Sequence, residues 1–176
     1  MWQELRILGA RPLRDARSRR RPRWDGSKYR QTVEYFGNYG YKLVDLDHDG
    51  TPELSAYDER FAYAFGAYAD SFSPPVIWHW RAGKLVDATR DFPAVIKANA
   101  KEAFRLFTRS KRRHDDIAAH AVLAAWTADQ CLLGQSAQAF ARLEAARKAG
   151  DLGAPKAGAR YITQLRAFLK RGGYLP

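Results

Sequence analysis

Hydrophobic and polar residues alternate with a period of two in the first half of the chain. Aromatic and β-branched positions mark one stretch before an acidic run, Tyr39–Val44, and another after it, Leu54–Phe65, where Phe61, Tyr63 and Phe65 stand between small residues. Successive residues of a β-strand face opposite sides of a sheet, so this period predicts strands. We therefore expect two strands joined by the acidic run as a hairpin loop.

A second hairpin is predicted where two apolar runs, Pro74–Trp80 and Lys84–Thr89, flank a short turn at Gly83. Alternation places His79 on one face and three apolar side chains on the other, namely Val76, Trp78 and Trp80. With the aromatic residues of the first hairpin, these rings would form either a platform for sugars or bases, or the core of a small sheet. We favour the core, because apolar stripes are usually buried.

From Pro93 onward the apolar spacing changes to that of helices. Proline suits a first helical turn, basic residues suit the last turn of a helix, and acidic residues suit the first. Glycines at Gly134, Gly150 and Gly172 mark the predicted helix ends. The pattern predicts helices over approximately 93–113, 115–134, 136–150 and 159–170.

These elements predict an α+β fold, in which a small antiparallel sheet with a calcium-binding hairpin loop precedes a C-terminal bundle of three to four helices. We expect residues 1–23 to form a basic arm without packed structure, residues 24–92 to form the sheet, and residues 93–176 to form the helical region. A chain of 176 residues is long enough for one such domain.

The acidic run between the first two strands has the spacing of a calcium loop. Ca²⁺ takes six to eight oxygen ligands, which a loop supplies from alternate positions and from a backbone carbonyl at position seven. A glycine at position six, here Gly50, allows the chain to bend back around the ion. The predicted ligands are the side chains of Asp45, Asp47, Asp49 and Glu53 and the carbonyl of Thr51.

The acidic run has two alternative interpretations. The twelve-residue EF-hand needs a bidentate Glu at position twelve, and Ala56 stands there, so this loop is not an EF-hand. An acidic turn, in which Asp side chains cap backbone amides and the remaining charge is solvated, uses the same residues. We favour metal, because carboxylates packed so closely repel one another without a cation, and calcium over magnesium, which dehydrates reluctantly.

A calcium loop between two strands resembles the nine-residue hairpin loop of FG-GAP and VCBS-type repeats. The resemblance is carried by Val44–Leu54, and the wider run to Pro93 looks like uncharacterised bacterial proteins with one such hairpin before a small helical region. It implies a structural Ca²⁺ and a secreted or periplasmic location. Two features depart from the repeat pattern: His48 stands where glycine is common, and one copy cannot close a propeller.

Charge is distributed unevenly. Residues 1–30 hold ten Lys/Arg and three Asp/Glu, residues 31–100 hold six and ten, and residues 101–176 hold fourteen and six, which together give the net charge of +11. A basic arm can bind nucleic acid through phosphate contacts, with the cationic helices assisting. The arginines of this alternative are Arg17, Arg19, Arg20, Arg21 and Arg23. An unstructured leader, or the ragged start of a longer chain, is the simpler explanation for the arm.

The sequence predicts no catalytic residue. Glycine-rich phosphate loops, a Gly-x-Ser-x-Gly elbow, a His-Glu-x-x-His helix and cysteine-based zinc spacing are all missing from it, so our expectation leans away from an enzyme. No apolar run reaches the roughly 20 residues of a membrane span. The chain also shows no secretory signal, so a cytoplasmic location stays open beside the secreted one.

We therefore expect a non-catalytic binding or interaction module of bacterial type with a structural calcium ion, whose partner would be a protein or a ligand of the cell envelope. The alternative is a basic nucleic-acid-binding protein.

Overall fold

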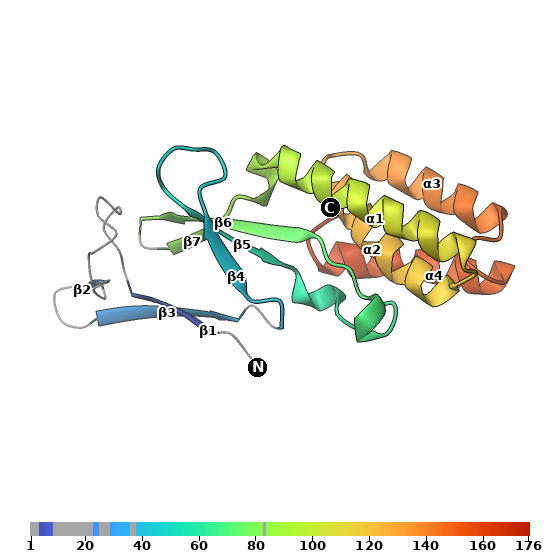
Figure 1. Ribbon diagram of the computed structural model, residues 1–176, viewed down its shortest axis with the longest axis horizontal. Coiled ribbons are helices and arrows are strands. Elements are labelled where there is room, and N and C mark those ends of the chain that lie inside the picture. The colour runs from blue at the N-terminus through green and yellow to red at the C-terminus, as the bar shows by residue number, and fades with distance from the viewer. Residues whose placement is uncertain (1–3, 9–22, 25–28, 36–37, 83) are drawn as a thin grey trace. The chain divides into compact units, whose positions relative to one another are not determined.

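The computed structural model describes the chain except for residues 1–3, 9–22, 25–28, 36–37 and 83. The described chain forms two compact units. The sheet unit comprises Met1–Glu59 and Val76–Phe92, and the helical unit comprises Arg60–Pro75 and Pro93–Pro176. Strands and helices are segregated, so the predicted α+β class is confirmed (Figure 1).

Two groups of paired strands are described in the sheet unit. In the first, the spatial order is β1-β3-β2, with antiparallel pairs throughout. The second is a four-stranded antiparallel sheet with the order β4-β5-β6-β7, which confirms the small antiparallel sheet expected from the sequence. The bounds are β1 Glu4–Leu8, β2 Arg23–Trp24, β3 Tyr29–Tyr35, β4 Tyr41–Val44, β5 Glu53–Tyr57, β6 Pro75–Arg81 and β7 Lys84–Asp87.

Both predicted hairpins lie in the four-stranded sheet. Strands β4 and β5 pair from Tyr41 with Ala56 to Val44 with Glu53, so the acidic run is the connecting loop. Strands β6 and β7 pair up to Arg81 with Lys84. Apolar side chains of this sheet gather around Leu54 and Ala56, against which Tyr41, Trp78 and Leu85 pack. Trp78 therefore belongs to a small core, as expected.

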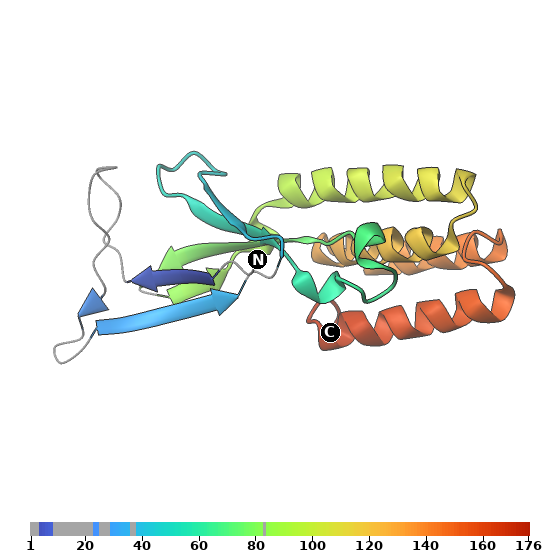
Figure 2. The same ribbon diagram turned by 60° about the horizontal axis from the view of Figure 1, so that its bottom comes forward.

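The helical unit contains four α-helices in its described residues, α1 Pro93–Arg112, α2 Asp116–Leu132, α3 Ser136–Lys148 and α4 Pro155–Arg171, and Figure 2 shows their axes running side by side. Proline opens α1 and α4, where its missing N–H is not needed. The carboxylate of Asp115 caps α2 by accepting the N–H of Ala118 at 3.0 Å. Helix α4 begins at Pro155, four residues before the predicted start.

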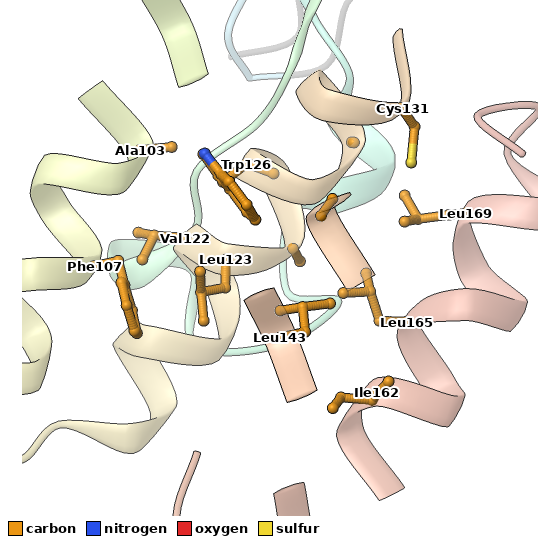
Figure 3. Packing of buried hydrophobic residues seen from close by; sticks show 14 of the residues in the cluster. Ala103, Phe107, Val122, Leu123, Trp126, Cys131, Leu143, Ile162, Leu165 and Leu169 are labelled. Atoms are coloured by element: carbon orange, nitrogen blue, oxygen red, sulfur yellow. The ribbon is translucent and has the colours of Figure 1, made fainter. Parts of the chain in front are cut away.

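One large apolar core holds the helices together. Helix α2 lies at its centre and is buried on nearly all sides, because small alanines let the other helices approach it closely. In Figure 3, side chains of all four helices converge, among them Phe107, Trp126, Leu143 and Leu165. The lone cysteine, Cys131, is buried within this core and is not part of a disulfide.

The predicted strand beyond Tyr57 is wrong. After β5 the chain forms the short 3₁₀-helices Glu59–Phe61 and Tyr68–Asp70. The ring of Phe61 packs edge-on against Phe168 at 4.9 Å between centroids, and Phe65 packs against the same ring at 5.2 Å. These aromatic residues joined the helical core instead of a sheet, because that core offers them far more apolar surface. They therefore form no platform with Trp78.

Candidate metal centre

Three carboxylates converge in the loop between β4 and β5. Asp45, Asp47 and Asp49 each offer an oxygen, and these oxygens all lie within 4.8 Å of one another. Asp47 and Asp49 are exposed, and Asp45 is half-buried. At such separations, like charges repel by about 1 kcal/mol per pair even at the dielectric constant of water. A cation between them would remove that repulsion, so this loop could hold a metal ion.

Backbone hydrogen bonds fix the orientation of each carboxylate. Asp45 Oδ2 accepts the N–H of Gly50 at 3.0 Å, Asp47 Oδ1 accepts that of Asp49 at 3.2 Å, and Asp49 Oδ1 accepts that of Thr51 at 2.7 Å. One oxygen of each side chain is thus used within the loop. The other oxygen accepts no hydrogen bond among the described residues, and for Asp45 this Oδ1 is also buried.

The loop bends through two residues in the left-handed region. Gly50 has φ 85°, as the position-six glycine of a calcium loop requires, and a Cβ there would meet nothing within 4 Å. His48 has φ 62° although it carries a side chain. Glycine adopts such a φ at the lowest cost, so His48 holds a conformation that is unfavourable for a residue with a side chain.

Glu53 lies apart from the three aspartates. Its side chain is fully buried; Oε2 accepts the N–H of Leu46 at 2.7 Å, and Oε1 lies 3.4 Å from Nδ1 of His79. Leu46 is near the start of the loop and Glu53 ends it, so this carboxylate ties the two ends together. His79 of β6 extends the contact to a further strand. The expected ligand Thr51 is exposed at the same turn.

The side chains of the alternative nucleic-acid site lie outside the described part of the structure. Arg17, Arg19, Arg20 and Arg21 lie outside the described residues, and Arg23 is in β2, where only its backbone is described. Strand β1, Glu4–Leu8, precedes these arginines in the sequence and belongs to the stretch expected to form the basic arm.

A second acidic group is buried in the helical unit. Asp129 of α2 is fully shielded from solvent, and its Oδ2 accepts the Nδ2 hydrogen of Asn99 at 2.8 Å. Burial raises the pKa of Asp129 to about 8. The hydrogen bond from Asn99 acts in the opposite direction and lowers this pKa, but burial has the larger effect. A carboxyl with this pKa is protonated at neutral pH, and its proton belongs on Oδ1, which accepts no hydrogen bond among the described residues. It lies far along the chain from the acidic loop and belongs to the other unit.

Sequence reasoning found the aspartates but missed the contact between Glu53 and His79, and it missed the buried Asp129. The spacing of the loop is local and visible in the sequence. The partner of Glu53 is His79, which lies in the other hairpin. The only sign of it in the sequence was the alternation along this strand, which places His79 on the opposite face from Trp78. The burial of Asp129 had one sign in the sequence, which is its position inside the apolar run Ile117–Leu133.

In the described part of the chain, no helix combines the length and the apolar character needed to cross a membrane.

Comparisons with known proteins match part of the chain. Residues 96–173 match the family described as sll0997 C-terminal domain. An uncharacterized protein, y4bJ, of Sinorhizobium fredii is 35% identical over 101 residues, which are 57% of this chain and 16% of that protein. A probable thylakoid lumen protein, sll0997, of Synechocystis is 29% identical over 103 residues, 57% of this chain and 30% of that protein.

The chain thus spans less than a third of the length of either relative. No solved structure matches it. The family match lies within the helical unit and begins three residues after the start of α1, so it is helices α1 to α4 that resemble the C-terminal domain of the sll0997 family.

Proposed function

We propose that the protein is a non-catalytic binding module of bacterial type whose β4–β5 loop holds a structural Ca²⁺ ion. The arrangement of the three aspartates carries the proposal: one oxygen of each orients the side chain through the backbone, and a second oxygen is left for a ligand. Hard oxygen donors from short side chains suit calcium, and among the described residues no cysteine or histidine belongs to this group.

The proposed ligand set adds the Thr51 carbonyl and Glu53 to Asp45, Asp47 and Asp49. Glu53 would join by turning Oε1 from His79 toward the ion while Oε2 keeps the N–H of Leu46. The ion would then be bonded to both ends of the loop and would fix the register of β4 against β5. Because these ligands are assembled only in the folded hairpin, binding energy becomes folding energy.

A location outside the cytoplasm accompanies this proposal. Millimolar calcium is available there, so a loop of modest affinity would be filled. The description of the Synechocystis relative as a probable thylakoid lumen protein agrees with such a location. The partner would be a protein or a ligand of the cell envelope.

A calcium titration followed by thermal unfolding tests the proposal. At free calcium 100-fold above Kd, the folded state should gain about 2.7 kcal/mol, which corresponds to roughly 5–10 °C in Tm. Magnesium at equal concentration should give a much smaller rise. The double variant Asp45→Asn/Asp49→Asn should lose the calcium response.

A matched control is Asp70→Asn/Asp91→Asn, which removes the same charge at two positions away from the loop and should respond to calcium as the parent does. A calcium response that survives in the loop variant, or none at millimolar calcium in the parent, would reduce the loop to an acidic turn.

Glu53→Gln separates the two parts of the ligand set. If Glu53 is a ligand, the variant should bind calcium about tenfold more weakly, because removing a charged ligand costs on the order of 1.4 kcal/mol. Isothermal titration measures this directly. Unchanged affinity would restrict the site to the aspartates and Thr51.

A further inference from the structure

The helical unit has a small pocket beside its core. It lies where α1 and α2 meet the turn into α3 and has a volume of about 230 Å³. Its polar and aromatic lining consists of Lys97, Lys101, Phe104, Trp126, Gln130 and Gln135. Ligand sites for drug-sized molecules are usually larger than about 300 Å³, so this pocket suits a single amino-acid residue or a molecule of that size.

Every charged side chain in the lining is cationic. Lys97 and Lys101 are exposed, stand four residues apart on α1, and have no ion-pair partner among the described residues. Like charges at this helical spacing repel one another. The guanidinium of Arg142 lies 4.4 Å from the ring centre of Phe104, which brings a third cation to the same place. An anion would be attracted by all three.

The pocket also presents hydrogen-bond donors beside an aromatic surface. Trp126 is 9% exposed, and its indole N–H has no partner among the described residues. Figure 3 shows the indole nitrogen at the end of the ring that points toward Ala103 of α1. Gln130 and Gln135 add side-chain amides, and Phe104 and Trp126 pack with ring centroids 5.7 Å apart. An indole N–H can only donate, so it requires an acceptor from a ligand or from water.

We propose that this pocket binds a carboxylate attached to an apolar group, with the carboxylate on Lys97, Lys101 and the indole N–H and the apolar group against Phe104. The chemistry is that of a free aromatic carboxylic acid or of the C-terminal residue of a peptide. The site belongs to the unit without the calcium loop, and it stands independently of the metal proposal.

The test compares matched probes with and without the negative charge. N-acetylphenylalanine, its neutral amide, and a short flexible peptide ending in phenylalanine, with its C-terminus free or amidated, are titrated into the full chain labelled with ¹⁵N. The free acid or the free-ended peptide should shift the indole N–H signal of Trp126, which a Trp126→Phe variant identifies. The amidated forms should bind about tenfold or more weakly, as expected for the loss of one charged contact.

Two lysine variants complete the test. Lys97→Gln/Lys101→Gln should weaken binding of the carboxylate probes by about tenfold or more, and raising salt should weaken it in the parent. Lys148→Gln/Lys170→Gln changes the net charge equally at exposed positions outside the pocket and should leave binding unchanged.

If the free acid binds as tightly as the peptide, the ligand is a small carboxylate; if the peptide binds at least tenfold more tightly, it is a peptide C-terminus. Both results support the proposal. It is overturned if no carboxylate probe binds at millimolar concentration, if acid and amide bind equally, or if the Lys97→Gln/Lys101→Gln variant binds as the parent does.

Discussion

The two units are held together by different means. The helical unit buries a continuous cluster of apolar residues contributed by all four helices. The four-stranded sheet has only a small cluster around Leu54 and Ala56, and its loop between β4 and β5 carries three aspartates. Burial of apolar surface therefore stabilises the helices on its own, whereas the hairpin would gain proportionally more from the proposed ion. The following predictions test this difference.

The largest effect expected is the pH dependence of the helical unit, caused by Asp129. In the unfolded chain its pKa is the ordinary 3.8, and in the folded chain it is about 8. Between these values the unfolded state releases the proton and the folded state retains it. Stability contributed by this group is therefore present below pH 4 and is lost as pH rises toward 8, by roughly 1.4 kcal/mol per pH unit.

Urea unfolding followed by circular dichroism at pH 6, 7 and 8 measures this slope. Asp129→Asn keeps the shape and the acceptor for Asn99 but has no proton to lose, so it should remove most of the slope and be the more stable protein at pH 8. Equal slopes in the parent and the variant would show that Asp129 is ionised in the folded state.

Truncating a core side chain should have the next largest effect. Leu143 is fully buried among the helices, so Leu143→Ala should lower the free energy of unfolding by about 2–5 kcal/mol. Calcium should not restore the stability lost in this variant. Leu54→Ala in the sheet should cost less, since fewer apolar neighbours surround it, and calcium should recover part of the loss. The same calcium response in both variants would contradict the separation of the two units.

A glycine pair compares backbone strain in the two units. Gly50 and Gly134 have φ of 85° and 76°, and an added Cβ would meet no atom within 4 Å at either. Each change to Ala should therefore cost about 1–2 kcal/mol through the backbone alone. Only Gly50→Ala should also weaken the calcium-induced rise in Tm. If Gly134→Ala weakened it equally, the calcium effect would not arise in the loop.

The smallest effect concerns His48. Its φ of 62° places a side chain where glycine is favoured, so His48→Gly should stabilise the loop by less than about 1 kcal/mol. Thermal unfolding without calcium measures it. A loss of stability would mean that the imidazole makes a contribution of its own.

Local patterns explain which parts of the fold were predictable. The alternation before and after the acidic run fixed the hairpin, and Val44 pairs with Glu53 at the ends of the loop. Proline, acidic starts and glycine stops located the helices to within a few residues. Spacing likewise identified the cluster of three aspartates, because carboxylates that converge in one loop are neighbours in sequence.

Long-range contacts explain the rest. Phe61 and Phe65 alternate with small residues as in a strand, yet both rings pack against Phe168 of α4. That contact is distant in sequence, so the local pattern does not reveal it. Glu53 occupies a ligand position in the sequence, yet its Oε1 faces His79 from another hairpin. The pocket beside Trp126 combines residues of α1, α2 and the following turn, and no motif marks such a combination.

The excursion of Arg60–Pro75 into the helical core has a consequence for modularity. Strands β5 and β6 are hydrogen-bonded neighbours, yet the chain between them leaves one unit, contributes Phe61 and Phe65 to the other and returns. The helical unit is therefore discontinuous in sequence. A fragment cut at Pro93 would contain the whole family match but lack two aromatic residues of its own core. Truncation at that boundary should therefore leave a helical bundle with an open apolar face, and a stable helical fragment would have to carry Arg60–Pro75 as well.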